Sequence, residues 1–356
     1  MALKSLIISI KHLGDVVTST VLIPMLKGRF PGMEIHYLVN PGAAPLVEPH
    51  PEVARVFRAP RSSGWRSLLS LVRGLRAERY EYAFDLSEGD RSAFLSLASG
   101  ARVRAGYFTD RKYFARNLIT RVKAPSWKYL PRRAVTECHA DLARAVGCAD
   151  PLAPMASLGV SPGGAAEAAA FLSLHNPAGD PYSVCHFTAR DPIRLWPAEH
   201  CADAARFLRR RLGPVFLAAS GADGDMPFVE RVAELSGGAA VPAADMSLSG
   251  FMALVSGARG VLGLDSLVVH MAGAYGVPAV TLFGPSREAN WLPKGPWVRA
   301  AHMDLPCRSC VTGGCLGGGV SRCLKEMDFE TFVRPHLEEL LESAPPRGAA
   351  SPAPAA

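Results

Sequence analysis

Residues 261–286 read VLGLDSLVVHMAGAYGVPAVTLFGPS, and this stretch decides the fold. The pattern predicts a short buried strand from Gly260 to Leu264, then a helix, then a second strand from Ala279 to Phe283. Asp265 and Ser266 stand between the first strand and the helix, where such side chains can cap the helix. A strand, a helix and a strand in this order predict parallel pairing in an α/β sheet.

The start of this helix is suited to an anionic ligand. Free N–H groups, the Ser266 hydroxyl and the positive end of the helix dipole meet there, and together they favour a phosphate or pyrophosphate. His270 follows one turn into the helix, and the second strand ends in Gly-Pro-Ser286. Because parallel strands end at the same edge of a sheet, we expect both strand ends to border one crevice.

The composition is that of an ordinary globular protein. The chain has 356 residues, of which 49% are hydrophobic and 20% are charged, which is enough for two cores. No apolar run reaches the roughly 18 residues of a membrane-spanning helix, and Ser5–Ile10 is too short for a signal-peptide core. We therefore expect a cytoplasmic protein of two domains.

Positive charge is concentrated in the first part of the chain. Residues 1–150 hold 23 Lys and Arg against 13 Asp and Glu, whereas residues 151–356 hold 16 against 19. A basic half attracts a membrane surface, a nucleic acid or an anionic substrate, but a simple solvated surface has the same composition. The arginines are not interleaved with aromatic residues as in nucleic-acid binders, so we expect no nucleic acid partner.

Pro and Gly residues divide the chain near residues 150–165, and strands alternate with helices on both sides of this point. We predict further strands at Ser5–Ile10, Glu34–Val39, Tyr82–Leu86, Tyr182–Phe187 and Val215–Ala219, and helices at Val16–Lys27, Ala198–Arg211, Pro227–Leu235, from Ser247 and at Phe329–Leu341. This alternation predicts an α/β protein of two doubly wound parallel sheets that face a central cleft.

The first predicted strand leads into Lys11-His-Leu-Gly14-Asp15. One glycine is too few for the dinucleotide fingerprint, so this turn does not favour a nicotinamide-dependent oxidoreductase. Gly14 permits a tight turn, and Asp15 stands at the start of the next helix, at the carboxyl end of a central strand, where ligands collect. Two interpretations of Asp15 stay open: it caps the helix, or it acts as a general base.

Four further blocks follow the Gly14-Asp15 turn in a fixed order. They are His186-Phe-Thr188-Ala-Arg190, Arg194-Leu-Trp196-Pro197, Met246-Ser-Leu248 and Asp265-Ser266 with His270. Together they resemble glycosyltransferase family 9, the bacterial heptosyltransferases, over residues 4–325. The lack of Gly after Asp265-Ser266, the Phe-Gly-Pro-Ser286 block near Trp291 and the late cysteines resemble the heptosyltransferase III type in particular.

The resemblance implies the GT-B fold, which consists of two Rossmann-like domains. The expected parts are an acceptor-binding domain at 1–155, a nucleotide-sugar-binding domain at 165–325, a C-terminal helix at 326–345 and a disordered tail at 346–356. The implied reaction moves a heptose from ADP-heptose to the inner core of lipopolysaccharide, with inversion and with no required cofactor. The expected partners are ADP-heptose, a lipid-anchored core oligosaccharide and, peripherally, the inner membrane, which a basic patch of Arg102, Arg104, Arg111 and Lys112 would contact.

The resemblance also assigns roles to single residues. Asp15 matches the catalytic base, and Arg194 matches the basic residue that stabilises the leaving diphosphate. Donor contacts fall on Thr188, Ser220, Asp223, Met246, Asp265, Ser266, Leu267 and His270, and acceptor contacts fall on Lys11, Gly14 and Arg104. Two positions depart from the family. Arg194 replaces a Lys but can still grip a phosphate with two hydrogen bonds, and Leu267 replaces the Gly of many members.

Four late cysteines form a C-x2-C-x4-C-x7-C pattern, namely Cys307, Cys310, Cys315 and Cys323. Four thiolates at this spacing can enclose a structural Zn²⁺ or an iron–sulfur cluster, whereas reduced thiols or a local disulfide are the other interpretations. None of these would perform sugar transfer.

Two other functions share most of these features. A GT-B glycosyltransferase with a different nucleotide sugar, acting on another envelope glycan, would differ only in its donor pocket. A non-catalytic protein that binds a nucleotide sugar in envelope assembly is also compatible with the fold, although Asp15 favours an enzyme.

Overall fold

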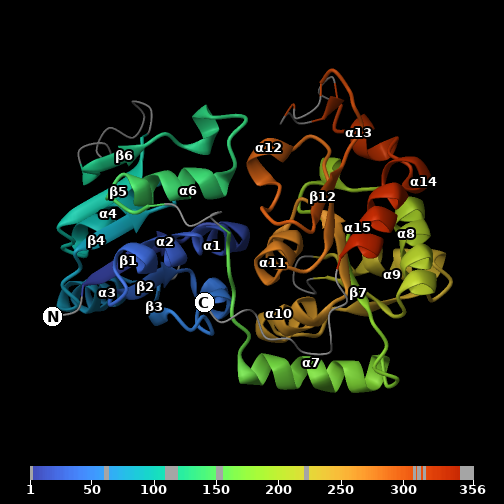
Figure 1. Cartoon of the computed structure of the whole chain (residues 1–356), viewed down its shortest axis with the longest axis horizontal. Helices are drawn as coiled ribbons and strands as arrows, with labels where there is room; N and C mark the ends of the chain where they lie inside the picture. Colours follow the sequence, from blue (N-terminus) through green and yellow to red (C-terminus); the bar gives the residue numbers. More distant parts are fainter. Residues whose placement is uncertain are drawn as a thin grey trace. The chain divides into compact units, whose positions relative to one another are not determined.

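The structure is a computed structural model that describes residues 3–59, 64–108, 119–149, 155–219, 224–307, 310, 314–315 and 318–344. Internal contacts divide the chain into two compact units, Met1–Gly159 and Val160–Ala356. Within the described residues each unit is built on its own six-stranded sheet, blue to green in Figure 1 for the first unit and green to red for the second. The predicted tail at 346–356 lies outside the described residues.

The first sheet is parallel throughout and has the strand order β3-β2-β1-β4-β5-β6. Its strands are β1 (Lys4–Ser9), β2 (Glu34–Val39), β3 (Val53–Arg58), β4 (Tyr82–Asp85), β5 (Val103–Tyr107) and β6 (Val122–Ala124). The central strand β1 carries Leu6, Ile7 and Ile8, all fully buried. A continuous apolar run is what a parallel strand covered on both faces requires.

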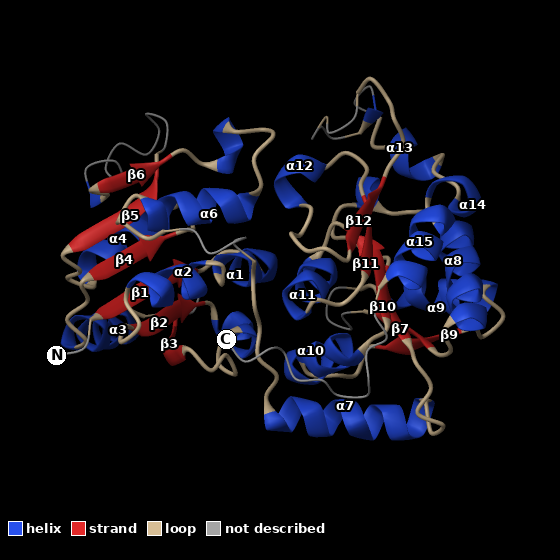
Figure 2. Cartoon of the chain, in the orientation of Figure 1, coloured by secondary structure: helices blue, strands red, loops and turns tan. Residues whose placement is uncertain are grey.

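Helices cover both faces of the first sheet (Figure 2). They are α1 (Leu13–Ser19), α2 (Leu22–Arg29), α3 (Trp65–Ala77), α4 (Asp90–Ala98) and α6 (Val135–Arg144). α6 packs against α1 and α2, whereas α3 packs against α4. Two short 3-10 helices, η1 (Pro41–Leu46) and η3 (Trp127–Tyr129), complete the described part of this unit.

The second sheet repeats this plan with the order β12-β11-β10-β7-β8-β9, again parallel throughout. Its strands are β7 (Ser183–His186), β8 (Val215–Ala218), β9 (Ala240–Ala243), β10 (Gly260–Leu264), β11 (Ala279–Leu282) and β12 (Val298–Ala301). Its helices are α7 (Pro162–His175), α8 (Ala198–Arg211), α9 (Met226–Leu235), α10 (Leu248–Gly257), α11 (Leu267–Tyr275), α12 (Glu288–Trp291), α13 (Arg322–Lys325), α14 (Phe329–Phe332) and α15 (Arg334–Ser343), with the 3-10 helix η4 (Pro192–Arg194).

Both strand orders place a topological switch point at the centre of the sheet. In the first unit the order reverses at β1 and β4, and in the second unit it reverses at β7 and β10. Chain segments that leave the carboxyl ends of two such strands diverge, which opens a crevice where ligands bind. The sequence blocks around Asp15, Thr188 and Asp265 all follow strands at these reversal points.

Several predicted boundaries were wrong. The helix predicted at Val16–Lys27 begins earlier and is two helices, α1 and α2, because the chain breaks its regular hydrogen bonding around Thr20. The helix predicted at Phe329–Leu341 is likewise two helices, α14 and α15, which meet at Val333. Pro335 explains this break, since its ring lacks the N–H that would continue the hydrogen bonding of α14.

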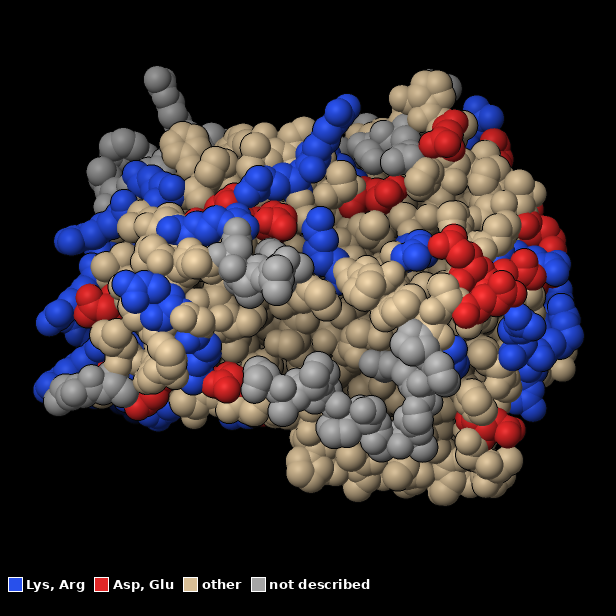
Figure 3. All heavy atoms as spheres, in the orientation of Figure 1, with Lys and Arg blue, Asp and Glu red and all other residues tan. Residues whose placement is uncertain are grey.

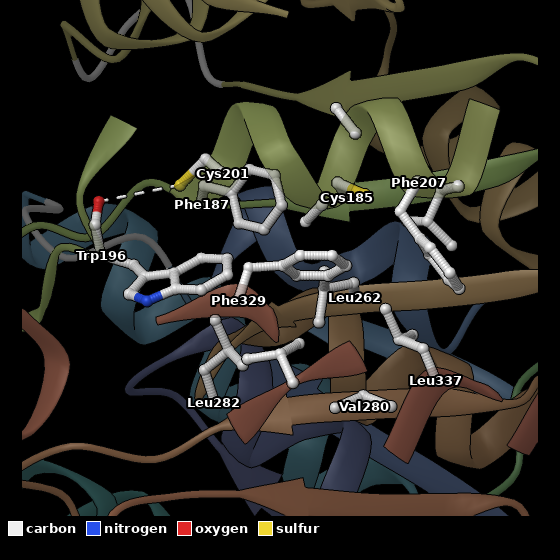
Figure 4. Close-up of a cluster of buried hydrophobic side chains, with 14 of the residues drawn as sticks. Cys185, Phe187, Trp196, Cys201, Phe207, Leu262, Val280, Leu282, Phe329 and Leu337 are labelled. Atoms are coloured by element: carbon white, nitrogen blue, oxygen red, sulfur yellow. Dashed lines mark hydrogen bonds between the residues drawn. The ribbon is translucent and has the colours of Figure 1, made fainter. Parts of the chain in front are cut away.

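The core of the second unit forms where α8, α14 and α15 pack on the sheet (Figure 4). Trp196 is fully buried at the edge of this core, and its Nε1 donates to the carbonyl of Met327 at 2.7 Å. The Cys201 thiol donates to the Trp196 carbonyl at 3.7 Å. Trp196 therefore ties the segment that ends in Arg194 to the interior of the unit.

The surface charges follow the imbalance of the sequence. In Figure 3, Lys and Arg dominate the visible face of the first unit, whereas both signs are interspersed on the second. Among the described residues, no helix is both long enough and apolar enough to cross a membrane.

The burial of α15 gives a test of the second core. Leu337 on α15 is 3% exposed, whereas Leu174 on α7 is 74% exposed. We expect Leu337→Ala to lower the free energy of unfolding by about 2–5 kcal/mol, because it removes buried methyl groups and leaves a cavity. The matched change Leu174→Ala is expected to stay within about 0.5 kcal/mol of the parent. Guanidinium unfolding followed by circular dichroism measures both, and equal midpoints would contradict this core.

Candidate functional site

An ion pair stands at the carboxyl edge of the second sheet. Arg194 ends η4, and its Nη2 donates to the Asp265 carbonyl oxygen at 2.7 Å and to Asp265 Oδ2 at 2.9 Å. The Asp265 side chain is only 11% exposed, against 35% for Arg194. The other guanidinium N–H groups of Arg194 make no hydrogen bond within the described part of the chain. The ion pair thus places a cation beside the start of α11, where the other N–H groups of Arg194 can donate to a ligand.

The first turn of α11 has an unused hydroxyl. Ser266 is the residue before the helix, yet its side chain caps no N–H group, so the predicted cap was wrong. Its Oγ is buried and has no hydrogen-bond partner among the described residues. Since the N–H groups that follow, from Leu267 onward, also lack a side-chain cap, this helix start offers several donors to an anion.

His270 lies on the same corner, one turn into α11. It is 6% exposed, and its Nε2 is 3.9 Å from Asp265 Oδ1. Its ring stands edge-on to Trp291 of α12, with ring centroids 6.2 Å apart. The structure therefore brings Arg194, Asp265, Ser266 and His270 together, as the sequence suggested.

Thr188 belongs to a second cluster at this edge, two residues beyond the end of β7. Its Oγ1 donates to Asp225 Oδ2 at 2.8 Å and lies 3.4 Å from His186 Nε2. Burial lowers the pKa of His186 to about 4, and the nearby Asp225 carboxylate only partly opposes this, so the imidazole is neutral at pH 7. Asp225 was not predicted from the sequence. Its only sequence signal is its place as an acidic residue just before a predicted helix.

The structure describes only some of the remaining residues that were predicted to bind the donor. Met246 is half-buried and follows β9, so it stands at the same edge as Thr188 but beyond the intervening strand β8. The next residue, Ser247, caps α10 by accepting from Gly250 N at 3.1 Å. Ser220 and Asp223 lie outside the described residues.

Asp15 is the third residue of α1 rather than its cap. The helix begins at Leu13, and His12 precedes it without a side-chain cap, so the capping interpretation of Asp15 was wrong. Gly14 accordingly lies inside the helix and not in a turn. Asp15 is half-buried, and its negative charge is favoured by the helix dipole at this end.

The predicted acceptor contacts do not share one place. Lys11 is exposed and stands just after β1, near Asp15 in the chain. Arg104 is instead paired in register with Ala83, which is level with Leu6, toward the amino end of the sheet. Its guanidinium donates to the carbonyls of Ile119 and Ala101, each at 3.0 Å. These bonds give Arg104 a part in holding its own fold, away from the edge that carries Asp15.

A second carboxylate at this edge escaped the sequence reasoning. Glu88 follows β4 with a φ of 49°, a conformation that is uncommon outside glycine. Its side chain is 7% exposed and forms an ion pair with Lys128, while its Oε1 has no hydrogen-bond partner among the described residues. Residues in such a strained backbone conformation are often found at functional sites.

The structure describes the four late cysteines as free thiols. All eight cysteines of the chain are free thiols, and no three metal-binding side chains cluster among the described residues. Burial raises the pKa of Cys323 to about 11, and the charges of Cys315, Cys310 and Cys307 raise it further to a smaller extent. Cys315 Sγ accepts from the backbone N–H of Arg322, at 3.4 Å.

The two doubly wound domains have the GT-B fold, and the comparisons with known proteins identify a glycosyltransferase. The chain belongs to glycosyltransferase family 9 (heptosyltransferase), whose family model matches residues 68–320. This match contains Thr188, Arg194 and Asp265, whereas Asp15 precedes it.

Named relatives are similar over most of their length. Lipopolysaccharide heptosyltransferase 3 of Escherichia coli is 24% identical over 79% of this chain and 83% of its own. Lipopolysaccharide heptosyltransferase 1 of Pseudomonas aeruginosa is 25% identical over 88% and 87%.

Solved structures share the fold. A family 9 glycosyltransferase from Veillonella parvula superposes with a TM-score of 0.81 at 18% identity, covering 96% of this chain and 97% of its own. The E. coli heptosyltransferase WaaC with ADP gives 0.72 at 20% identity, covering 95% and 100%. The iron-containing dodecameric glycosyltransferase TibC of enterotoxigenic E. coli gives 0.57 at 13% identity, covering 96% and 78%.

Thiol accessibility tests the cysteine arrangement. Cys307 is exposed and Cys310 and Cys315 are half-buried, whereas the other five thiols are buried. Burial also raises the pKa of Cys138 to about 11, which further slows its reaction because the thiolate is the reactive form. We expect a disulfide-exchange reagent at pH 8 to titrate Cys307, Cys310 and Cys315 in the native protein.

The denatured protein is the control, and all eight thiols are expected to react in it. Native thiols that become reactive only after a chelator is added, with release of zinc or iron, would contradict the metal-free arrangement.

Proposed function

We propose that this chain transfers a heptose from ADP-heptose to the inner core of lipopolysaccharide, with inversion at the anomeric carbon. The observation that carries the proposal is the corner formed by Arg194, Asp265 and the open start of α11, at the switch point of the second sheet. The family of the chain and the names of its relatives support the choice of sugar.

The corner suits a nucleoside diphosphate. The Ser266 hydroxyl and the first N–H groups of α11 would donate to one phosphate, and the unused N–H groups of Arg194 would donate to the other. Met246 and Thr188 would then contact the nucleoside and the sugar from the same edge of the sheet. WaaC, a fold relative, has been solved with ADP and with an ADP-2-deoxy-2-fluoro heptose.

Arg194 would also act during the reaction. As the bond between C1 of the heptose and the diphosphate breaks, negative charge builds on the leaving oxygen. A guanidinium that Asp265 already holds in place stabilises this charge without first having to reorganise.

Asp15 would be the general base. A single displacement requires one carboxylate to take the proton of the acceptor hydroxyl while its oxygen attacks C1 from the side opposite the diphosphate. Asp15 follows the carboxyl end of β1, in the first turn of α1, where the helix dipole favours a negative charge. The acceptor would be lipid-anchored, and the excess of Lys and Arg on the first unit (Figure 3) would favour an anionic membrane surface on the cytosolic side.

Nucleotide selectivity tests the donor. Titration calorimetry with ADP, UDP and GDP is expected to show ADP binding at least about tenfold tighter than the others. Asp265→Ala is expected to weaken ADP binding about 10- to 100-fold, because it frees Arg194 from its position. Asp180→Ala removes an exposed carboxylate at the opposite end of β7 and is the matched control. A preference for UDP or GDP would assign another nucleotide sugar, and no binding would favour a non-catalytic role.

Asp15→Asn tests the base. We expect kcat for transfer to fall at least about 100-fold while the ADP affinity stays unchanged, because the amide cannot accept the proton. ADP release in the presence of ADP-heptose and a heptose-deficient core acceptor measures the rate. Asp90→Asn removes an exposed acid from the first turn of α4 and controls for the lost helix-end charge. A parental kcat in the Asp15→Asn enzyme would show that Asp15 is not the general base.

A further inference from the structure

A buried chain of hydrogen bonds ends at Asp15. Tyr107 at the end of β5 bonds through its hydroxyl to Nδ1 of His139 on α6. Nε2 of the same imidazole lies 3.2 Å from Thr18 Oγ1 on α1. Thr18 Oγ1 in turn donates to the Asp15 carbonyl oxygen at 3.1 Å. Three elements of the first unit thus meet at one imidazole, and the last link reaches the residue proposed as the base.

The direction of every proton in this chain can be assigned. A threonine hydroxyl has one proton, and Thr18 gives it to the Asp15 carbonyl, so Thr18 Oγ1 must accept from His139. His139 therefore carries its proton on Nε2, and its bare Nδ1 accepts from the Tyr107 hydroxyl. Each O–H and N–H donor of the chain then has one acceptor, which is what a buried network requires.

Burial keeps both ring systems neutral. Tyr107, His139 and Thr18 are each no more than 3% exposed. Desolvation lowers the pKa of His139 to about 3 and raises the pKa of Tyr107 well above its usual value. The single tautomer of His139 consequently persists over the whole range of pH in which the enzyme would work.

The geometry points to His139 as a positioning residue, which holds the first turn of α1, and with it the Asp15 carboxylate, through Thr18. This inference rests on the proposed function, in which Asp15 is the base. α1 is only seven residues long and has no side-chain cap, so its own hydrogen bonds fix its first turn poorly. The buried chain from β5 and α6 supplies what the helix lacks.

The test breaks the link nearest to Asp15. Thr18→Val keeps the shape of the side chain but removes both hydrogen bonds, and it is expected to lower kcat about 10- to 100-fold, because small misplacement of a reacting group is costly. Thr18→Ser keeps the hydroxyl and is expected to retain at least half of the parental kcat. The affinity for ADP is expected to be unchanged in both variants.

A double variant separates positioning from loss of stability. If Thr18 and His139 act through Asp15, then Thr18→Val is expected to change kcat less than twofold in the Asp15→Asn background. A tenfold further loss in that background, or parental kcat in Thr18→Val, would overturn the inference. Should Thr18→Val not fold, Tyr107→Phe breaks the far end of the chain, and a parental kcat there would count equally against it. Parental kcat in Asp15→Asn alone would instead refute the proposed base.

Discussion

The parallel pairing of β7 with β10 is the constraint on which the donor site depends. In this register Gly263 lies opposite His186, so the two strands end within one residue of each other. A Cβ on Gly263 would lie 3.1 Å from the His186 carbonyl oxygen, so a larger residue would push the strands apart. Because the strands pair this closely, Thr188 and Asp265 emerge side by side, and Arg194 can reach Asp265.

The two units use a similar arrangement behind their sites. In the second unit the neutral imidazole of His186 lies next to Thr188, whose hydroxyl donates to Asp225. In the first unit the neutral imidazole of His139 bonds to Thr18, whose hydroxyl donates to the carbonyl of Asp15. In each case a ring that stays neutral at pH 7 lies beside a threonine hydroxyl that follows a central strand of the sheet. Because such dipoles are already oriented, they need no reorganisation when charge develops during a reaction.

The strands at the centre of each sheet were predictable, whereas the strands farther out, β3, β5, β6, β9 and β12, were not predicted. β2 and β10 have the predicted bounds, and β1 lies within one residue of them, because strands buried on both faces are continuous apolar runs. β6, β9 and β12 have only three or four residues each and went unpredicted, since so short a stretch carries no periodic signal. The helix end near Thr20 was also not predicted, whereas Pro335 in the sequence could have indicated the break at Val333.

The sequence by itself determined the parallel α/β plan and the residues around Asp265, because strand and helix periodicity and the helix-start chemistry are local. Only the tertiary structure decided that Arg194 pairs with Asp265, that Thr188 donates to Asp225 and that His139 connects Tyr107 to Thr18. These partners are 71, 37 and up to 121 positions apart in the chain. Contacts at such separations arise from strand order and burial, which cannot be predicted from the residues that adjoin each partner in the sequence.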